Sequence, residues 1–307
     1  MDLERVIEHY TKNSSILLDL SGITIQSGPF ERGDFEDISP KEIKHALAGI
    51  ESAKKVMTCD NYAGLECAAF EFEGFYHKLQ RLVNQMESNF GNTIGCATET
   101  QPLNREKIYE VLDGLGELAD IATKKGDDLN LGQTPLRFHS LFKVVQYLSN
   151  ELGLKHSSNS NGHSPSNTDE NLFAAAWYCA MFSDKKPVII TGDNDLVNMF
   201  KIIPPILADK QFRLYNQRFL GAFSNRPELV FRSLQSDYKV LGFDYSDEIP
   251  VSGFTNVPSV VKRVYEFWKS FQISSEGPVE PRLVGFKHYK PIPVPHEQSV
   301  ASIVPDA

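Results

Sequence analysis

The sequence is poor in cysteine and contains no long apolar run. Its 307 residues include four cysteines, and none of them has the spacing of a zinc site. We expect them to be buried free thiols in a reducing cytoplasm. No stretch reaches the roughly 18 apolar residues that span a bilayer, and the first residues lack the pattern of a secretory leader. These absences predict a cytoplasmic protein with no membrane partner.

Positive charge is also scarce, because the formal net charge is −9 at pH 7. This argues against a protein that is basic over its whole surface. It does not exclude an enzyme acting on nucleic acid, since local basic patches steer ligands and bound metal ions reverse local charge. Hydrophobic residues make up 41% and charged residues 23% of the chain, which is typical of globular proteins.

Short apolar strands alternate with helical patterns, which predicts an α/β fold. Three strands are expected, at Ile16–Leu18, Val56–Thr58 and Val188–Thr191. Ser39, Pro40 and Glu42 have the pattern of a helix start, with the helix ending near Ala53. The other expected helices are Leu3–Tyr10, one from about Asn61, the amphipathic segments Tyr76–Met86, Arg105–Ala122 and Phe138–Leu152, and the apolar helix Glu170–Phe182.

Acidic residues stand at the ends of these apolar elements. Asp19 follows the first strand, Glu66 lies early in a helix, and Asp169 opens the alanine-rich helix. Asp193 and Asp195 follow the strand Val188–Thr191. Ligands bind at the carboxyl edge of open α/β sheets, so these carboxylates are candidate ligands for something cationic. The structural alternatives are a turn residue for Asp19, a solvent-facing Glu66 and a helix-start carboxylate for Asp169.

The ordered motifs L-L-D-L-S-G, L-E, T-D and V-I-I-T-G-D-N-D-L resemble those of the PIN-domain nucleases. The resemblance covers roughly residues 14 to 215. It implies a three-layer α/β/α fold with a central parallel sheet and acids gathered at its carboxyl edge. By this resemblance the matching acids are Asp19, Glu66, Asp169 and Asp193, with Asp195 as a further acid and Ser21 and Thr191 as the hydroxyl residues that support the site.

The implied function is metal-dependent hydrolysis of RNA. Converging carboxylates repel one another, and hard oxygen ligands suit Mg²⁺ or Mn²⁺. One or two such ions polarise a phosphodiester and generate hydroxide for in-line attack. Asp19, Glu66, Asp169 and Asp193 would hold metal directly or through water, and Asp195 would be an outer or second ligand. RNA is the expected substrate, and DNA stays an open alternative.

The chain departs from the compact members of that family. About 100 residues separate Glu66 from Asp169, and the enlarged helical segment 76–152 accounts for them. The expected organisation is a nuclease domain over 1–215, a helical extension over 216–275 and a proline-rich tail over 276–307. An apolar stripe from Val260 to Phe271 has to pack on the nuclease core or on a second subunit, which makes a homodimer one candidate. The bacterial toxins of the family that this chain resembles lack such a long C-terminal extension, so we do not expect a stand-alone toxin.

Residues 201–240 supply the candidate substrate contacts, because seven basic residues there face three acidic ones. Arg213, Arg218 and Arg226 are candidates for binding phosphates. Aromatic residues lie among them, although their helical spacing is more typical of a core. The polar segment Lys155–Asn167 is a candidate lid over the acids, and its histidines lack partners at ligand spacing.

Two other functions compete with nuclease activity. One is a PIN-like module that binds RNA or protein without cleaving it, against which the complete set of acids argues. The other is a phosphatase of the haloacid dehalogenase type, because I-L-L-D-L-S-G-I and T-G-D-N-D resemble the first and last motifs of that superfamily. That chemistry requires an aspartate two residues after the nucleophile, and Ser21 stands there.

Overall fold

The fold is mixed α/β with a mostly parallel sheet, so the predicted α/β class is confirmed. The computed structural model describes residues 3–10, 14–23, 30, 38–92, 101–125, 135–154, 167–182, 184–208, 221–233 and 237–243. The chain divides into two units. Unit 1 comprises Met1–Leu129, Val188–Gly192 and Val230–Val240, and unit 2 comprises Asn130–Pro187, Asp193–Leu229 and Leu241–Ala307.

The sheet has the strand order β1-β2-β3-β4. Strands β1 (Ser14–Leu18) and β2 (Lys186–Thr191) lie side by side although some 170 residues separate them, and both are apolar and largely buried. Both therefore confirm strands predicted from the sequence. Strands β3 (Glu228–Arg232) and β4 (Tyr238–Leu241) are joined by a short connection in which the Ser233 N–H donates to the Asp237 carbonyl at 2.8 Å. So short a connection makes β3 and β4 an antiparallel hairpin.

The strand predicted at Val56–Thr58 is wrong, because these residues form the last turn of α3 (Pro40–Thr58). Val56 and Met57 continue the buried helical stripe of Ile50 and Ala53, so the helix period extends past Ala53. The residue that pairs with β1 is Tyr62, which makes a parallel bridge to Ile16. The following helix begins at Glu66 instead of near Asn61.

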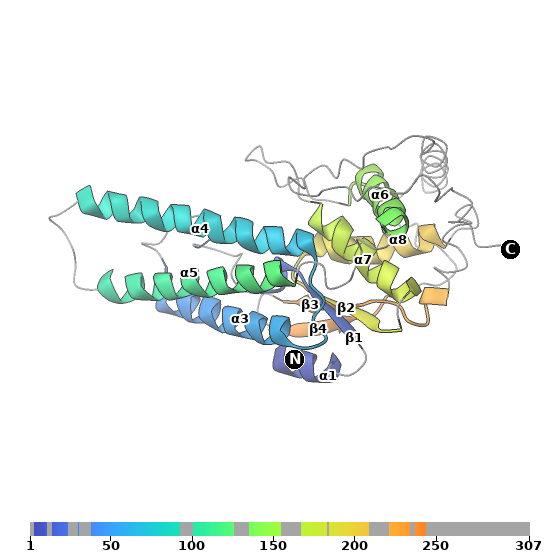
Figure 1. The fold of residues 1–307 in the computed structure, drawn as a ribbon, viewed down its shortest axis with the longest axis horizontal. Coiled ribbons are helices and arrows are strands. Elements are labelled where there is room, and N and C mark those ends of the chain that lie inside the picture. Colours follow the sequence, from blue (N-terminus) through green and yellow to red (C-terminus); the bar gives the residue numbers. More distant parts are fainter. Residues whose placement is uncertain are drawn as a thin grey trace. The chain divides into compact units, whose positions relative to one another are not determined.

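Helices α3, α4 (Glu66–Asn92) and α5 (Gln101–Lys124) make up most of the helical part of unit 1, beside the short α1 (Leu3–Tyr10). Ser39 caps α3 as the sequence predicts: its side chain accepts from the Glu42 N–H, and Glu42 bonds back to the Ser39 N–H. Figure 1 shows α4 and α5 running antiparallel along one another, with α3 beside α5. The predicted amphipathic stripe of α5 is buried, including Leu115 and Leu118.

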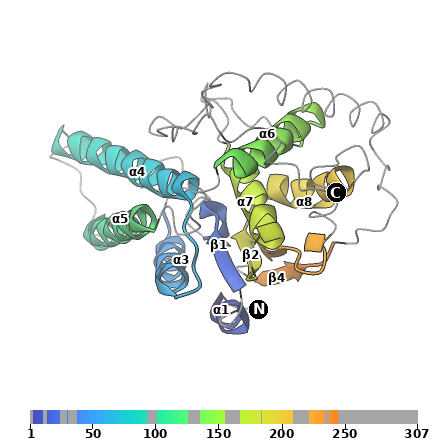
Figure 2. The ribbon, with the colours of Figure 1, turned by 45° about the vertical axis from the view of Figure 1, so that its right-hand side comes forward.

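Unit 2 contains α6 (Pro135–Glu151), α7 (Thr168–Phe182) and α8 (Asn194–Leu207), which contact one another (Figure 2). Helix α7 is buried on nearly every side, as its uniformly apolar sequence predicts. Its aromatic rings pack against aromatic rings from other parts of the unit. Phe173 meets Phe200 of α8 edge to face at 5.0 Å, and Trp177 meets Phe223 at 5.6 Å. Phe223 is thus a packing residue, the more common role for an aromatic stripe.

Several predictions fall outside the described residues. These are the lid segment up to residue 166, Arg213 and Arg218, the apolar stripe 260–271 and the tail 276–307. Among the helices that the structure describes, none is long and apolar enough to cross a bilayer.

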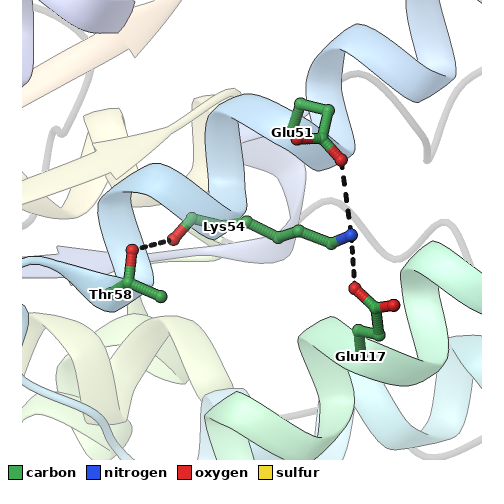
Figure 3. Close-up of polar contacts among 4 residues, drawn as sticks. All are labelled: Glu51, Lys54, Thr58 and Glu117. Atoms are coloured by element: carbon green, nitrogen blue, oxygen red, sulfur yellow. Dashed lines mark hydrogen bonds and ion pairs between the residues drawn. The ribbon is translucent and has the colours of Figure 1, made fainter.

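Lys54 ties α3 to α5 in unit 1. Its ammonium group lies between Glu51 on its own helix, at 3.3 Å, and Glu117 on α5 (Figure 3). Glu117 is the main cause that raises the pKa of Lys54, and Glu51 adds to it. The Lys54 side chain is 24% exposed and that of Glu117 63% exposed, so solvent screens much of this attraction.

Replacing Lys54 by methionine should lower the free energy of unfolding by less than about 1 kcal/mol near neutral pH. Because the folded-state pKa is raised, this contribution is complete below the unfolded lysine value of about 10.4 and fades as the pH rises through the folded value. Urea unfolding across that range measures it. Lys44→Met, at an exposed position of the same helix, is the control. A wild-type advantage that stayed constant well above the folded pKa would contradict the assignment.

Ser149 of α6 is fully buried, and within the described part of the chain its hydroxyl oxygen has no hydrogen-bond partner. A buried polar group without a partner is destabilising, and alanine is the best helix former. We therefore expect Ser149→Ala to raise the free energy of unfolding by about 1 kcal/mol, measured by urea unfolding. Ser88→Ala removes an exposed hydroxyl that bonds to the Gln85 carbonyl and should change stability little. A clear loss in Ser149→Ala would mean that the hydroxyl is bonded in solution.

Candidate active site around Asp19

The turn that carries Asp19 begins where β1 ends. The Asp19 N–H donates to the Ile190 carbonyl of β2 at 3.0 Å, which continues the pairing of the two strands by one residue. The chain then enters the short 3-10 helix η1 (Leu20–Gly22), closed by the Gly22 N–H on the Asp19 carbonyl at 2.9 Å. The Asp19 side chain is consequently held at the strand end and is only 4% exposed.

Two hydroxyl groups converge on one oxygen of the Asp19 carboxylate. The Thr191 Oγ1 donates to Asp19 Oδ2 at 2.7 Å, and the Ser21 hydroxyl donates to the same oxygen. Ser21 Oγ in turn accepts from the Gly192 N–H at 2.9 Å and lies 3.0 Å from Thr191 Oγ1. Charge-assisted bonds of this kind stabilise an ionised carboxylate. The structure thus brings together Asp19, Ser21 and Thr191, which the sequence predicted to be neighbours.

Two glycines let the turn and the strand end approach closely. A Cβ atom on Gly192 would lie 2.5 Å from the Ser21 carbonyl oxygen, and one on Gly22 would lie 2.7 Å from the Ile190 carbonyl oxygen. Neither glycine is among the described residues with positive φ. Gly192 is therefore required for close backbone approach and not for a left-handed backbone conformation.

The start of α4 lies near this turn, because α4 contacts η1. Glu66 is the first residue of α4 and its side chain is exposed, as expected for a glutamate that faces solvent. The helix dipole also favours a carboxylate at this position. Its neighbour Cys67 is buried. Burial raises the pKa of the Cys67 thiol, and the carboxylates of Glu71 and Asp19 raise it further. A raised pKa disfavours the thiolate, which is the form of cysteine that acts as a nucleophile.

The remaining predicted acids belong to unit 2. Asp169 and Glu170 are in the first turn of α7, where Asp169 is half-buried and Glu170 is buried. Asp193 caps α8: its Oδ1 accepts from the Asp195 N–H at 2.8 Å. A helix N-terminus stabilises such carboxylates on its own, so Asp169, Asp193 and Asp195 each have a structural role in this unit.

The donor chemistry of these residues suits Mg²⁺ or Mn²⁺, because carboxylate and hydroxyl oxygens are the ligands that hard cations prefer. However, too few such side chains lie close together among the described residues to bind one of these ions. Within the described part of either unit, no three His, Cys, Asp or Glu side chains gather closely enough to hold a metal ion. Neither unit by itself contains the predicted metal site, and the assignment of the five acids as ligands stays a prediction.

Two residues of the β3–β4 hairpin contact the turn and were not predicted to belong to the site. Arg232 donates through Nη1 to the carbonyls of Ser21 and Ile23, at 3.4 and 3.2 Å. The Tyr238 hydroxyl donates to the Gly22 carbonyl at 2.9 Å. In the sequence, Arg232 is one of seven basic residues between positions 201 and 240 and carries no local sign of this role. Arg226, a candidate phosphate contact, donates to the Phe243 carbonyl at 3.1 Å within unit 2.

Gly192→Ala should destabilise the protein by about 1–3 kcal/mol, because the added methyl group collides with backbone that is held on both sides. Thermal or urea unfolding measures the loss. Gly74→Ala is the matched control, since a Cβ at Gly74 meets nothing within 4 Å in an exposed part of α4 and alanine should stabilise that helix slightly. Equal behaviour of the two variants would show that the close approach does not exist in solution.

Comparison with known proteins yields no relative for this chain. No family model, no curated protein and no solved structure matches it. The resemblance to the PIN-domain nucleases therefore rests on the order of the acidic and hydroxyl residues in this chain.

Proposed function

We propose that this protein is a metal-dependent ribonuclease of the PIN-like type, which hydrolyses phosphodiester bonds of RNA. The observation that carries the proposal is the position of Asp19: a buried carboxylate at the end of β1, bonded to hydroxyls from its own turn and from the end of β2. This is the edge of a largely parallel sheet at which ligands bind in α/β proteins.

Burial of Asp19 supports a role in binding. Removing a carboxylate from water is costly unless other groups compensate for the lost hydration. A fold selected for stability alone has no need for an acid at this position. The two hydroxyls that converge on Oδ2 hold the carboxylate in one orientation, which is the preorganisation that a ligand for a cation requires.

The proposed ligands of Mg²⁺ or Mn²⁺ are the sequence-predicted acids Asp19, Glu66, Asp169 and Asp193, with Asp195 as a further one. When bound, such an ion would neutralise the carboxylates and provide an activated water for attack on phosphorus. Ser21 and Thr191 orient the Asp19 carboxylate. Thr191 is fully buried, so its hydroxyl keeps solvent away from that side of Asp19.

A non-catalytic PIN-like binding module is the second candidate. It is favoured by the absence of any three-acid group within the described residues of either unit. The haloacid dehalogenase chemistry is less favoured, because Ser21 occupies the position that needs a second aspartate and its hydroxyl bonds to Asp19.

The decisive experiment incubates the purified protein with Mg²⁺ or Mn²⁺ and single-stranded RNA, structured RNA or single-stranded DNA. We expect cleavage of RNA that falls about 100-fold or more in Asp19→Asn and in Asp193→Asn, the scale of losing one preorganised electrostatic contact. Asp113→Asn, an exposed position on α5, is the control and should cleave normally. Cleavage that persists in both variants would contradict the assignment of Asp19 and Asp193 as metal ligands. Metal-independent binding of RNA without cleavage would favour the binding module.

A further inference from the structure

Three carbonyl groups in succession, those of Ser21, Gly22 and Ile23, accept hydrogen bonds from side chains of one hairpin. Arg232 at the end of β3 reaches the first and third of them, and Tyr238 at the start of β4 reaches the second. The backbone of the turn is therefore held from the hairpin. The Ser21 hydroxyl and the Gly22 N–H at the same time bond to Asp19.

Arginine is an unfavourable choice for this position on grounds of stability. The guanidinium is half-buried, and burial lowers the pKa of Arg232. Its Nε is fully buried and has no hydrogen-bond partner among the residues that the structure describes. Such a donor is costly to bury, and apolar residues of similar volume often replace buried charges without loss of stability. An arginine that donates to two carbonyls of the turn at this cost points to a role other than stability alone.

That requirement follows from the position of Ser21. Its carbonyl is held by Arg232, and its hydroxyl contacts Asp19, Thr191 and the Gly192 N–H. A shift of this one residue changes every one of these bonds. Displacements of about 1 Å in catalytic groups reduce rates by about 100-fold, so a site built on Asp19 depends on a fixed turn.

We propose that Arg232 is a positioning residue, which together with Tyr238 fixes the turn Asp19–Ile23 and thereby the orientation of the Asp19 carboxylate. The catalytic consequence rests on the proposed ribonuclease function, whereas the fixing of the turn does not. Arg232 is thus assigned to the backbone of the site and not to the phosphates of a substrate. Both carbonyls accept from the single nitrogen Nη1, so the ammonium of a lysine could reach them as well. It would hold them less firmly, because a lysine lacks the planar guanidinium that fixes the direction of these bonds.

The first test does not depend on activity. Amide hydrogen exchange of Gly22 and Gly192 should quicken at least tenfold in Arg232→Met and, to a smaller extent, in Tyr238→Phe. The increase should exceed what the fall in the urea midpoint accounts for, since that fall reflects the carbonyls left without a donor. Arg226→Met removes a comparable arginine–carbonyl bond in unit 2 and should leave both amides unchanged. Unchanged exchange in Arg232→Met and Tyr238→Phe overturns the proposal. So does a drop in global stability that accounts for all of the faster exchange.

The second test applies once wild-type cleavage of single-stranded RNA has been measured. We expect Arg232→Met to lower kcat about 10- to 100-fold with KM within about twofold, the range seen when a supporting residue is lost, and Arg232→Lys to recover part of it. Arg81→Met, an exposed arginine on α4, should be unaffected. A raised KM with normal amide exchange would make Arg232 a substrate contact and overturn the proposal. If the wild type does not cleave RNA, the proposed function fails, and the exchange experiment still decides the role of Arg232.

Discussion

The pairing of the ends of β1 and β2 is the interaction on which the candidate site depends. One backbone bond, from Asp19 to Ile190, aligns the two strand ends. The same alignment places Thr191 within hydrogen-bond distance of the Asp19 carboxylate and presents the Gly192 N–H to Ser21. The register between two strands cannot shift by a single residue without consequence, because such a shift turns every side chain of the strand to the opposite face of the sheet. A slip between β1 and β2 would therefore lose both the core and the site.

The surroundings of the turn explain how one carboxylate can be kept buried. Two hydroxyls, one from the turn and one from the end of β2, donate to the carboxylate. The turn packs closely on the end of β2, where Gly22 meets the Ile190 carbonyl and Gly192 meets the Ser21 carbonyl. The hairpin holds the opposite side of the turn. Each of these contacts is modest, yet they all act on the same five residues. Hydrogen bonds and close contacts that converge on one turn in this way give its carboxylate a single orientation.

Much of this arrangement could be predicted, but not all of it. Asp19, Ser21 and Thr191 carry local signals, since each stands at the end of an apolar strand or one turn beyond it. The strand assigned to Val56–Thr58 failed because a short apolar run fits the end of a helix as well as a strand. Ser39 and its capping partners marked where that helix begins, and no comparable signal marked its end. Arg232 and Tyr238 could not be assigned from sequence, because their partners are carbonyl groups, which are identical in every residue.

The carboxylate at Asp19 and its partners come from widely separated parts of the chain. The bond from Thr191 spans 172 positions, and those from Arg232 span 209 and 211. Contacts of such long range form slowly, because the intervening chain must lose its freedom before they are made. During synthesis, the segment with Asp19 leaves the ribosome long before β2 and the hairpin do. A nascent chain therefore carries Asp19 and Ser21 without Thr191 and the hairpin, and the site is completed only when the last strands have been added to the sheet.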